Sequence, residues 1–375
     1  MDATTVRGLV QWEPTQPWEL TDIELDEPGP GEVRVAIKAA GLCHSDHLLL
    51  GGGYAGMSRP VVPGHEGAGI VEAVGPGVTS LVPGDHVLLL VPVPACGVCH
   101  ACISGMTYFC EDGQYTGGGR QITDHTARHH AKGQDLGIFV FLGTFAEASI
   151  VNERSCLKLD PSIAFKDACT IGCAGVTGWG AVQNTGRLET GDSVVVVGVG
   201  GVGANAIMSA RFGGAKDVVA VDPLASKREA ALSFGADHAF ATFDEARDHL
   251  RDVTWGKMAN LAVMTMGEGN GQLLDEALSL TGKRGRCVIV NVHPDNEHDA
   301  KLSLRALQSS EKQILGCLSG SWHGREGASF LLDLYRRGLY DPSKIVTKTF
   351  TLDEIDKGYA TQSAGECVRA VVVVD

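Results

Sequence analysis

Hydrophobic and polar positions follow two different patterns along this chain, and the change falls near residue 167. Before that point, short apolar runs are separated by Pro-Gly turns at 28–31, 76–77 and 83–84. Short runs bounded by such turns are typical of β-strands, so the pattern predicts an irregular antiparallel β-barrel. The expected strands cover residues 33–39, 69–74, 86–91 and 146–151.

After residue 167, buried-strand patterns alternate with helical ones, as expected for βα units of a doubly wound parallel sheet. The chain is therefore predicted to be an α/β protein, with a barrel domain at 1–174 and 319–375 and a parallel-sheet domain at 175–318. A strand-like end at 368–374 is expected to return to the barrel. The other expected strands cover 193–197, 217–221 and 287–292, and the expected helices cover 204–212, 226–234 and 327–337.

Composition narrows the classes of partner. The 375 residues are 44% hydrophobic, which is enough for two cores, and carry a formal charge of −14. That charge argues against nucleic acid or an anionic membrane as a partner. No secretory signal or membrane span is predicted, so we expect a cytoplasmic protein whose 11 cysteines are metal ligands or buried thiols.

A glycine-rich turn follows the apolar run 193–197. Gly198, Gly200 and Gly203 form a G-x-G-x-x-G motif between a predicted strand and a predicted helix. This arrangement lets backbone amides approach the pyrophosphate of a dinucleotide. Asp222 follows the next strand, where a carboxylate accepts hydrogen bonds from an adenosine ribose and repels a 2′-phosphate. The motif predicts NAD(H) rather than NADP(H); the alternative for Asp222 is a solvated strand-end carboxylate.

Four cysteines form a C-x2-C-x2-C-x7-C run. Such a set can wrap one tetrahedral ion, and structural zinc is the favoured ion. An iron–sulfur cluster is disfavoured, because its bacterial spacing ends in a three-residue gap followed by proline. Reduced, unliganded cysteines are the remaining alternative. The four residues are Cys96, Cys99, Cys102 and Cys110.

A second set of metal-ligating residues is scattered through the chain. Cys43 follows a predicted strand, His65 lies in a Gly-His-Glu triplet, and Cys173 precedes the parallel-sheet region. A lone cysteine is more often a small buried hydrophobe. Two thiolates and one imidazole would leave a tetrahedral zinc ion with one open position, a ligand set already known for alcohol dehydrogenase.

Together these motifs make the whole chain resemble the zinc-dependent medium-chain alcohol dehydrogenases. The resemblance implies a GroES-like barrel, a Rossmann domain and two zinc ions per chain, with Cys43, His65 and Cys173 as catalytic ligands and Glu66 beside the metal. It also implies that Asp46 orients His65 and that Ser45 takes the alcohol proton.

The resemblance also implies a set of cofactor contacts. They are His44 and Arg369 at the pyrophosphate, Asp222 and Lys227 at the ribose, Thr177 and Val202 at the nicotinamide, the turn residues Gly198, Gly200, Gly201 and Gly203, and Val290 and Val292.

Within that family, the segments 121–124, 141–145 and 177–180 are most similar to actinobacterial nicotinoprotein alcohol dehydrogenases. Those enzymes hold NAD(H) through turnover and reduce a nitroso dye. The resemblance implies a small-molecule alcohol or aldehyde substrate and a homo-oligomer, either dimer or tetramer.

Two positions depart from the family pattern. Leu48 stands where relatives carry the outer proton-relay histidine, and His47 comes one residue earlier. Either His47 replaces that catalytic relay from a shifted turn, or protons leave by another route. Pro92 replaces an aromatic residue of the substrate pocket, which predicts a wider pocket and a bulky apolar or aromatic primary alcohol. The resemblance places five uncharged residues around the substrate: Pro92, Phe141, Leu142, Val292 and Leu318.

The remaining histidines and cysteines are given plainer roles. His125, His129 and His130 lie in a polar segment at 117–134 and are expected to be surface side chains rather than a third metal site. Buried or unliganded thiols are expected at Cys156, Cys169, Cys287, Cys317 and Cys367.

Two rival functions stay open: a thiol-adduct formaldehyde dehydrogenase, and a non-catalytic nucleotide-binding or redox-sensing protein.

Overall fold

The computed structural model describes residues 4–267, 269–293 and 298–374, and the chain divides into two compact units. The first unit runs to Cys173 and also includes His323–Ser363 and the chain from Arg369 onward. The second unit comprises Ala174–Trp322 and Ala364–Val368. Each unit has its own sheet system and is described separately.

The first unit is built on two sheets. Its core is formed by alternate side chains such as Ile23, Leu25, Leu136 and Ile138, which are almost fully buried. One sheet has the order β1 (Thr4–Val10), β2 (Glu19–Leu25), β7 (His129–Ala131), β8 (Gln134–Ile138), β4 (Val61–Val62). The other has the order β10 (Cys156–Lys158), β6 (His86–Leu89), β5 (Gly67–Val74), β3 (Glu32–Gly41), β18 (Arg369–Val373), β17 (Val346–Phe350), and β9 (Ala148–Asn152) also pairs with β3.

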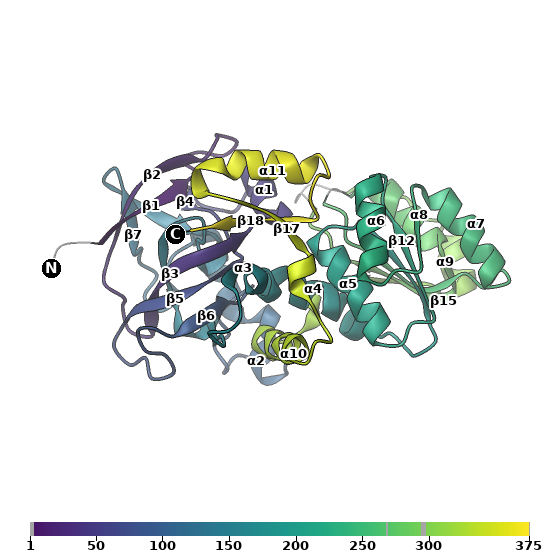
Figure 1. Ribbon diagram of the computed structural model, residues 1–375, viewed down its shortest axis with the longest axis horizontal. Helices are drawn as coiled ribbons and strands as arrows, with labels where there is room; N and C mark the ends of the chain where they lie inside the picture. The colour runs from purple at the N-terminus through teal and green to yellow at the C-terminus, as the bar shows by residue number, and fades with distance from the viewer. Residues whose placement is uncertain (1–3, 268, 294–297, 375) are drawn as a thin grey trace. The chain divides into compact units, whose positions relative to one another are not determined.

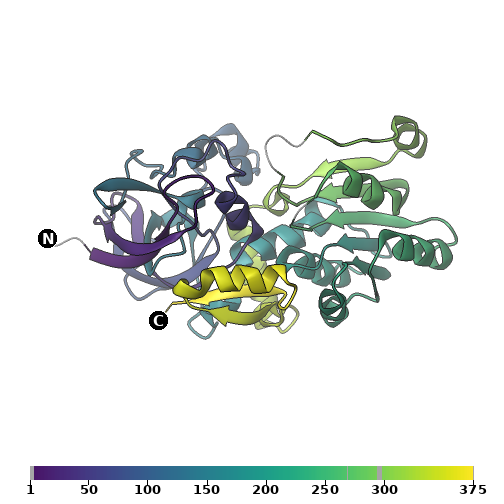
Figure 2. The same cartoon turned by 90° about the horizontal axis from the view of Figure 1, so that it is seen from above.

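The end of the chain returns to this unit, as the sequence predicts. Strand β18 pairs antiparallel with β3, with Val372 opposite Ala40, and the two lie side by side in Figure 1. Helix α11 (Ile355–Ser363) packs against β18, as seen from above in Figure 2. The other helices of the unit are α1 (His44–Leu50), α2 (His100–Ile103), α3 (Phe165–Ala168) and α10 (Gly324–Arg336).

The second unit contains a parallel sheet whose strands are β13 (His238–Phe240), β12 (Asp217–Val221), β11 (Ser193–Val197), β14 (Ala259–Met264), β15 (Thr281–Ile289) and β16 (Gln313–Gly316), in that order. Neighbouring strands in this order pair in parallel, which is the order of a dinucleotide-binding doubly wound sheet. The helices of this unit are α4 (Val176–Gly180), α5 (Gly201–Phe212), α6 (Ala225–Phe234), α7 (Phe243–Val253), α8 (Gly271–Ser279) and α9 (Leu304–Ser310).

Several boundaries differ from the predicted ones. Helix α5 begins at Gly201, three residues before the predicted start, because the glycines of the turn themselves enter the first helical turn. Strand β15 spans Thr281–Ile289, so Val290 and Val292 follow the strand instead of lying in it. None of the described helices is long and apolar enough to cross a lipid bilayer.

The polar segment at 117–134 is anchored rather than free. Arg128 pairs with Glu32 at 2.8 Å and with Asp124 at 2.6 Å. The expectation that His129 lies on the surface is wrong: it is 1% exposed in β7, and its Nε2 accepts a hydrogen bond from the N–H of Ile150 at 3.3 Å. His125 is exposed, as expected. The polar side chains of this segment are therefore held partly by one another and partly by Glu32 and Ile150 outside it.

Candidate active site and cofactor turn

Three separate turns of the first unit bring the open ligand set together. Cys43 immediately precedes α1, His65 lies in the turn between β4 and β5, and Cys173 lies in a π-helical turn at Ile171–Gly175. One ligand atom from each of these residues and from Glu66 lies within 4.8 Å of all the others. The sequence-predicted set is therefore one cluster in space.

The spacing of the donor atoms suits a zinc ion. Sγ of Cys173 lies 3.4 Å from Nε2 of His65. Tetrahedral coordination at ordinary zinc–sulfur and zinc–nitrogen bond lengths would separate such a pair by about 3.5 Å. Cys43 and His65 are 7% and 3% exposed, so the donors are largely shielded from water.

Asp46 orients the imidazole of His65. Its Oδ2 lies 2.9 Å from Nδ1 of His65, and its Oδ1 accepts the backbone N–H of Gly64 at 2.9 Å. With Nδ1 directed at a carboxylate, Nε2 is the nitrogen left to bind a metal. Gly64 itself has a φ of +94°, and a Cβ there would lie 2.6 Å from the backbone nitrogen of Phe145, so only glycine fits.

Glu66 pairs with Arg369, and both side chains are buried. Oε1 of Glu66 accepts a hydrogen bond from Nη2 of Arg369, while Oε2 has no partner among the described residues. Burial raises the pKa of Glu66 to about 7, although the guanidinium of Arg369 opposes that rise. Arg369, predicted to contact pyrophosphate, thus has its Nη2 on Glu66, and its buried Nε has no hydrogen-bond partner among the described residues.

The two thiols of the cluster ionise differently. A hydrogen bond from Cys173, together with the positive charges of Arg369 and His65, holds the pKa of Cys43 well below its usual value against the effect of burial. The same interaction with Cys43, followed by burial, raises the pKa of Cys173. Cys43 is therefore the thiol that is ready to ionise first.

A hydroxyl lies next to this cluster. Oγ of Ser45 is 3.9 Å from Sγ of Cys43. The ring of His47 stacks on Tyr359, with centroids 5.5 Å apart, and lies 5.8 Å from the ring of His44. These contacts put His47 on the side of α1 that faces α11.

Two tyrosines of the site were missed in the sequence. Tyr54 makes a side-chain hydrogen bond to Ser45, and burial, opposed by this bond, raises its pKa. Tyr359 donates to the carbonyl of Cys43 at 3.1 Å and so fixes the turn that carries this ligand. Tyr54 follows the Gly51-Gly52-Gly53 turn and Tyr359 lies far along the chain, so neither carries a local motif that marks the contact.

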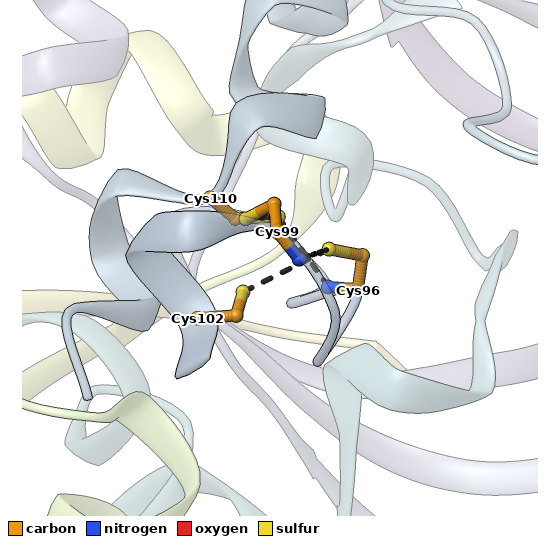
Figure 3. A group of neighbouring side chains, drawn as sticks. All are labelled: Cys96, Cys99, Cys102 and Cys110. Atoms are coloured by element: carbon orange, nitrogen blue, oxygen red, sulfur yellow. Dashed lines mark hydrogen bonds between the residues drawn. The ribbon is translucent and has the colours of Figure 1, made fainter. Parts of the chain in front are cut away.

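The four-cysteine run closes on itself, and its side chains face one another in Figure 3. The sulfurs of Cys96 and Cys102 are 3.9 Å apart, and those of Cys99 and Cys110 are 4.0 Å apart. Backbone N–H groups of Glu111 and Cys102 lower the pKa of Cys99 to about 6. Sulfur separations near 3.8 Å, about those of a tetrahedral tetrathiolate, fit a closed zinc site.

The glycine-rich turn has the shape that a dinucleotide needs. A Cβ on Gly203 would lie 2.0 Å from the carbonyl oxygen of Gly198, so helix and strand can approach only with glycine there. A Cβ on Gly200 would meet nothing within 4 Å, which leaves open space over the start of α5. Gly201 and Val202 form the first helical turn, where free N–H groups and the helix dipole favour a phosphate.

Asp222 and Lys227 have partners within the second unit. The carboxylate of Asp222 accepts the backbone N–H groups of Val199 at 2.8 Å and Leu224 at 3.0 Å. Lys227, predicted to contact the ribose, donates Nζ to the carbonyls of Cys367 and Val368. These hydrogen bonds fix the carboxylate of Asp222 beside the glycine turn, and those of Lys227 fix the backbone of the segment at 364–368.

The remaining predicted contacts are distributed over both units. Thr177 and Val202 lie on α4 and α5, which approach so closely that a Cβ on Gly178 would be 2.3 Å from the carbonyl of Val202. In the second unit, Val292 and Leu318 are 36% and 45% exposed. In the first unit, Phe141 and Leu142 are buried, whereas Pro92 lines a cavity of about 280 Å³ that also includes Tyr108, Arg154 and Arg325.

Comparisons with known proteins agree with this geometry. Residues 29–161 match the alcohol dehydrogenase GroES-like domain, and residues 201–334 match the zinc-binding dehydrogenase domain. The chain is 37% identical over 366 residues to alcohol dehydrogenase B of Mycobacterium tuberculosis, covering 98% of this chain and 97% of that protein. It belongs to the NAD-dependent, zinc-containing medium-chain alcohol dehydrogenases.

Other members of this family are similarly related. The chain is 39% identical to the NDMA-dependent alcohol dehydrogenase of Amycolatopsis methanolica, with 96% of each chain covered, which confirms the predicted subgroup resemblance. It is 33% identical to S-(hydroxymethyl)glutathione dehydrogenase of Paracoccus denitrificans, over 98% of this chain and 99% of that protein.

Solved structures give the same fold. The zinc-binding alcohol dehydrogenase domain protein of Burkholderia ambifaria has a TM-score of 0.91 at 29% identity, with all of both chains covered. The benzyl alcohol dehydrogenase of Acinetobacter calcoaceticus has a TM-score of 0.87 at 27% identity, covering 99% of this chain and all of that one. The barrel and the doubly wound sheet predicted from the sequence are thus confirmed as a GroES-like domain and a Rossmann-like domain.

Proposed function

We propose that this alcohol dehydrogenase oxidises bulky apolar or aromatic primary alcohols, with NAD as the hydride acceptor and one catalytic and one structural zinc ion per chain. The observation that carries the proposal is the Cys43–His65–Cys173 cluster, in which Asp46 leaves Nε2 of His65 free at 3.4 Å from a thiol sulfur. The second, structural zinc ion is supported by the closed four-cysteine site, which shares no residue with this cluster.

The chain's own residues divide the work of the reaction. Cys43, His65 and Cys173 would hold the zinc ion, which would supply Lewis acidity at the alcohol oxygen, and the Gly198–Gly203 turn would hold NAD, which would supply a hydride acceptor. The hydroxyl of Ser45 receives the alcohol proton, because it lies beside the ligand Cys43. Asp46 keeps the imidazole of His65 in one orientation, and Arg369 balances the charge of Glu66. The products are an aldehyde, NADH and one proton.

The substrate class rests on the predicted pocket lining and on one relative. Pro92, Phe141, Leu142, Val292 and Leu318 carry no charge, and the structural neighbour from Acinetobacter calcoaceticus is a benzyl alcohol dehydrogenase. The cavity at Pro92 also contains Arg154 and Arg325, so the proposal rests on the uncharged lining residues themselves. Each buried methylene contributes roughly 0.8 kcal/mol. We expect kcat/KM for benzyl alcohol to exceed that for ethanol by at least about tenfold. A flat or reversed series from ethanol to benzyl alcohol would contradict the apolar pocket.

Retention of the cofactor is a separate part of the proposal, supported by the similarity to an NDMA-dependent enzyme. The purified protein should carry NAD(H) that appears in its ultraviolet spectrum and is released on denaturation. It should also oxidise alcohol with the nitroso dye as acceptor and no added NAD. Protein that is purified free of nucleotide, and that needs added NAD for each turnover, would show that the cofactor exchanges freely.

The preference for NAD should depend on Asp222. Asp222→Gly removes a carboxylate that repels a 2′-phosphate, so the ratio of NAD to NADP use should fall. Asp222→Asn is the matched variant, because it keeps one oxygen to accept the N–H of Val199. Equal use of NAD and NADP by the unaltered protein would contradict this assignment.

A thiol-adduct formaldehyde dehydrogenase is the second candidate, favoured by the similarity to S-(hydroxymethyl)glutathione dehydrogenase. The two activities are separated by comparing S-(hydroxymethyl)glutathione with benzyl alcohol on the same preparation. We expect benzyl alcohol to be the better substrate; a higher kcat/KM for the adduct would favour the second candidate.

We also propose that the protein works in the cytoplasm as a homo-oligomer, either dimer or tetramer. Support for the oligomer comes from apolar side chains between and beside the four cysteines at 96–110. Of these, Val98, Ile103 and Phe109 are 80%, 70% and 55% exposed. Such clustered apolar exposure is typical of an interface. Sedimentation should show a dimer or tetramer that dissociates in Ile103→Glu, whereas a monomeric parent would contradict the proposal.

A further inference from the structure

A third group of metal-ligating side chains lies in the second unit, and neither zinc site nor the glycine turn uses it. Asp217, His238 and His249 each place one ligand atom within 4.8 Å of the other two. The sequence gives no ligand spacing here, since His238 comes 21 positions after Asp217 and His249 a further 11 positions on. Their proximity is created by the sheet and the helix that covers it.

The strand register places two of these residues on one face. In the parallel pair β12 and β13, His238 lies opposite Val219. Asp217 is two residues before Val219, and side chains two apart on a strand point to the same face. Asp217 and His238 therefore share one face of the sheet, at the start of both strands.

Helix α7 supplies the third residue. Its buried residues Ala246 and Leu250 belong to the same hydrophobic cluster as Val219, so the helix packs on this face. His249 comes three residues after Ala246 and immediately before Leu250, which turns it toward the strands. Its ring centroid lies 4.1 Å from that of His238.

The donor atoms are in a state that suits metal binding. Oδ2 of Asp217 and Nε2 of His249 are buried atoms without a hydrogen-bond partner among the described residues. The adjacent Asp237 is engaged elsewhere, by Arg211 and by the N–H of Val218.

We propose that Asp217, His238 and His249 bind a divalent first-row transition-metal ion of the zinc class. Two imidazoles and one carboxylate suit such ions better than Mg²⁺ or Ca²⁺, which prefer oxygen ligands. Three protein ligands leave at least one position for water, so the ion exchanges with the solvent. It would tie α7 to β12 and β13 and so stabilise the second unit against unfolding.

This site is independent of the cofactor. Asp217 begins β12, whereas Asp222 follows its carboxyl end beside the glycine turn. A strand of this length separates the two ends by about 15 Å. Substitutions at His238 and His249 should therefore leave alcohol oxidation and NAD binding unchanged.

The test uses the full-length protein, dialysed against a weak chelator so that only tightly held zinc remains. Calorimetric titration with Zn²⁺ should show one further exchangeable ion per chain, bound in the micromolar range. His238→Gln and His249→Gln should weaken that binding by more than about tenfold, since each removes one ligand. His298→Gln, at an exposed histidine of the same unit, is the matched control and should bind like the parent.

A second measurement separates the site from non-specific binding. Added Zn²⁺ should raise the unfolding temperature of the parent and of His298→Gln, but not that of His249→Gln or of the near-isosteric Asp217→Asn. An absence of exchangeable zinc in the parent, or equal zinc binding in all four variants, would overturn the proposal. A normal kcat in His249→Gln shows that its lost zinc binding does not come from misfolding.

Discussion

Nδ1 of His65 lies 2.9 Å from Oδ2 of Asp46, and this contact leaves Nε2 as the imidazole nitrogen that could bind a metal. The backbone N–H of Gly64 holds the other oxygen of the same carboxylate, so the ligand and its partner are fixed by one turn. The same aspartate thereby links the fold of the 63–67 turn to the chemistry of the site.

Asp46→Asn should lower zinc affinity or kcat by roughly 10- to 100-fold, because an amide no longer fixes the imidazole tautomer as a carboxylate does. Zinc content after dialysis and kcat for benzyl alcohol are the measurements. Asp22→Asn, at an exposed position on β2, is the matched control and should behave like the parent. Unaltered zinc content and kcat in Asp46→Asn would mean that Asp46 has only a structural role.

The two zinc sites should respond differently to loss of a ligand. Cys43→Ser should abolish turnover and leave the unfolding temperature nearly unchanged, because an open catalytic site contributes chemistry. Cys99→Ser should lower the unfolding temperature or yield, because a closed four-thiolate site contributes folding energy. Each variant should lose one zinc ion per chain by elemental analysis. Full activity with a single metal per chain would contradict the two-site assignment.

Proton release should pass through groups around Ser45. His47→Ala should slow alcohol oxidation most at low pH, where solvent base is scarce. His47→Phe keeps the stacking on Tyr359 and separates proton transfer from packing, so it should show the same pH-dependent loss. If His47→Ala has the parent pH–rate profile and Tyr54→Phe does not, the proton leaves along the Tyr54 hydroxyl that bonds to Ser45.

His129 should make the barrel sensitive to acid. Burial lowers its pKa to about 3, and its Nε2 accepts the N–H of Ile150, which requires the neutral ring. The imidazole of His129 binds a proton near pH 6.5 in the unfolded chain but not in the folded chain. The contribution of neutral His129 to the free energy of unfolding is therefore present above pH 6.5 and is lost as the pH falls below it. One pH unit below 6.5, the free energy of unfolding should be lower by about 1.4 kcal/mol than well above that pH.

The measurement for this prediction is the free energy of unfolding between pH 7 and pH 5, taken from denaturant titrations. His129→Gln should show a shallower fall over this range than the parent. His125→Gln, at an exposed histidine of the same segment, should retain the parent slope. Equal slopes in the parent and His129→Gln would show that His129 is protonated without cost to the fold.

Local chemistry determined much of this protein from its sequence. Turn glycines, strand-length apolar runs and cysteine spacing act over a few residues, so the barrel, the parallel sheet, the four-cysteine run and the turn from Gly198 to Gly203 could all be predicted. The second ligand set could be predicted only through the family resemblance, since Cys43, His65 and Cys173 have no common spacing.

Contacts between distant segments were decided only by the tertiary structure. The sequence could not show that Tyr359 holds the carbonyl of Cys43 or that Arg369 pairs with Glu66, because each partner lies about 300 residues from the other. His129 was misplaced on the surface because its polar neighbours hide a strand whose partner, β2, is 104 residues away at the Leu25–His129 pair. Asp217, His238 and His249 meet for the same physical reason: strand register and helix packing, rather than sequence spacing, bring their side chains together.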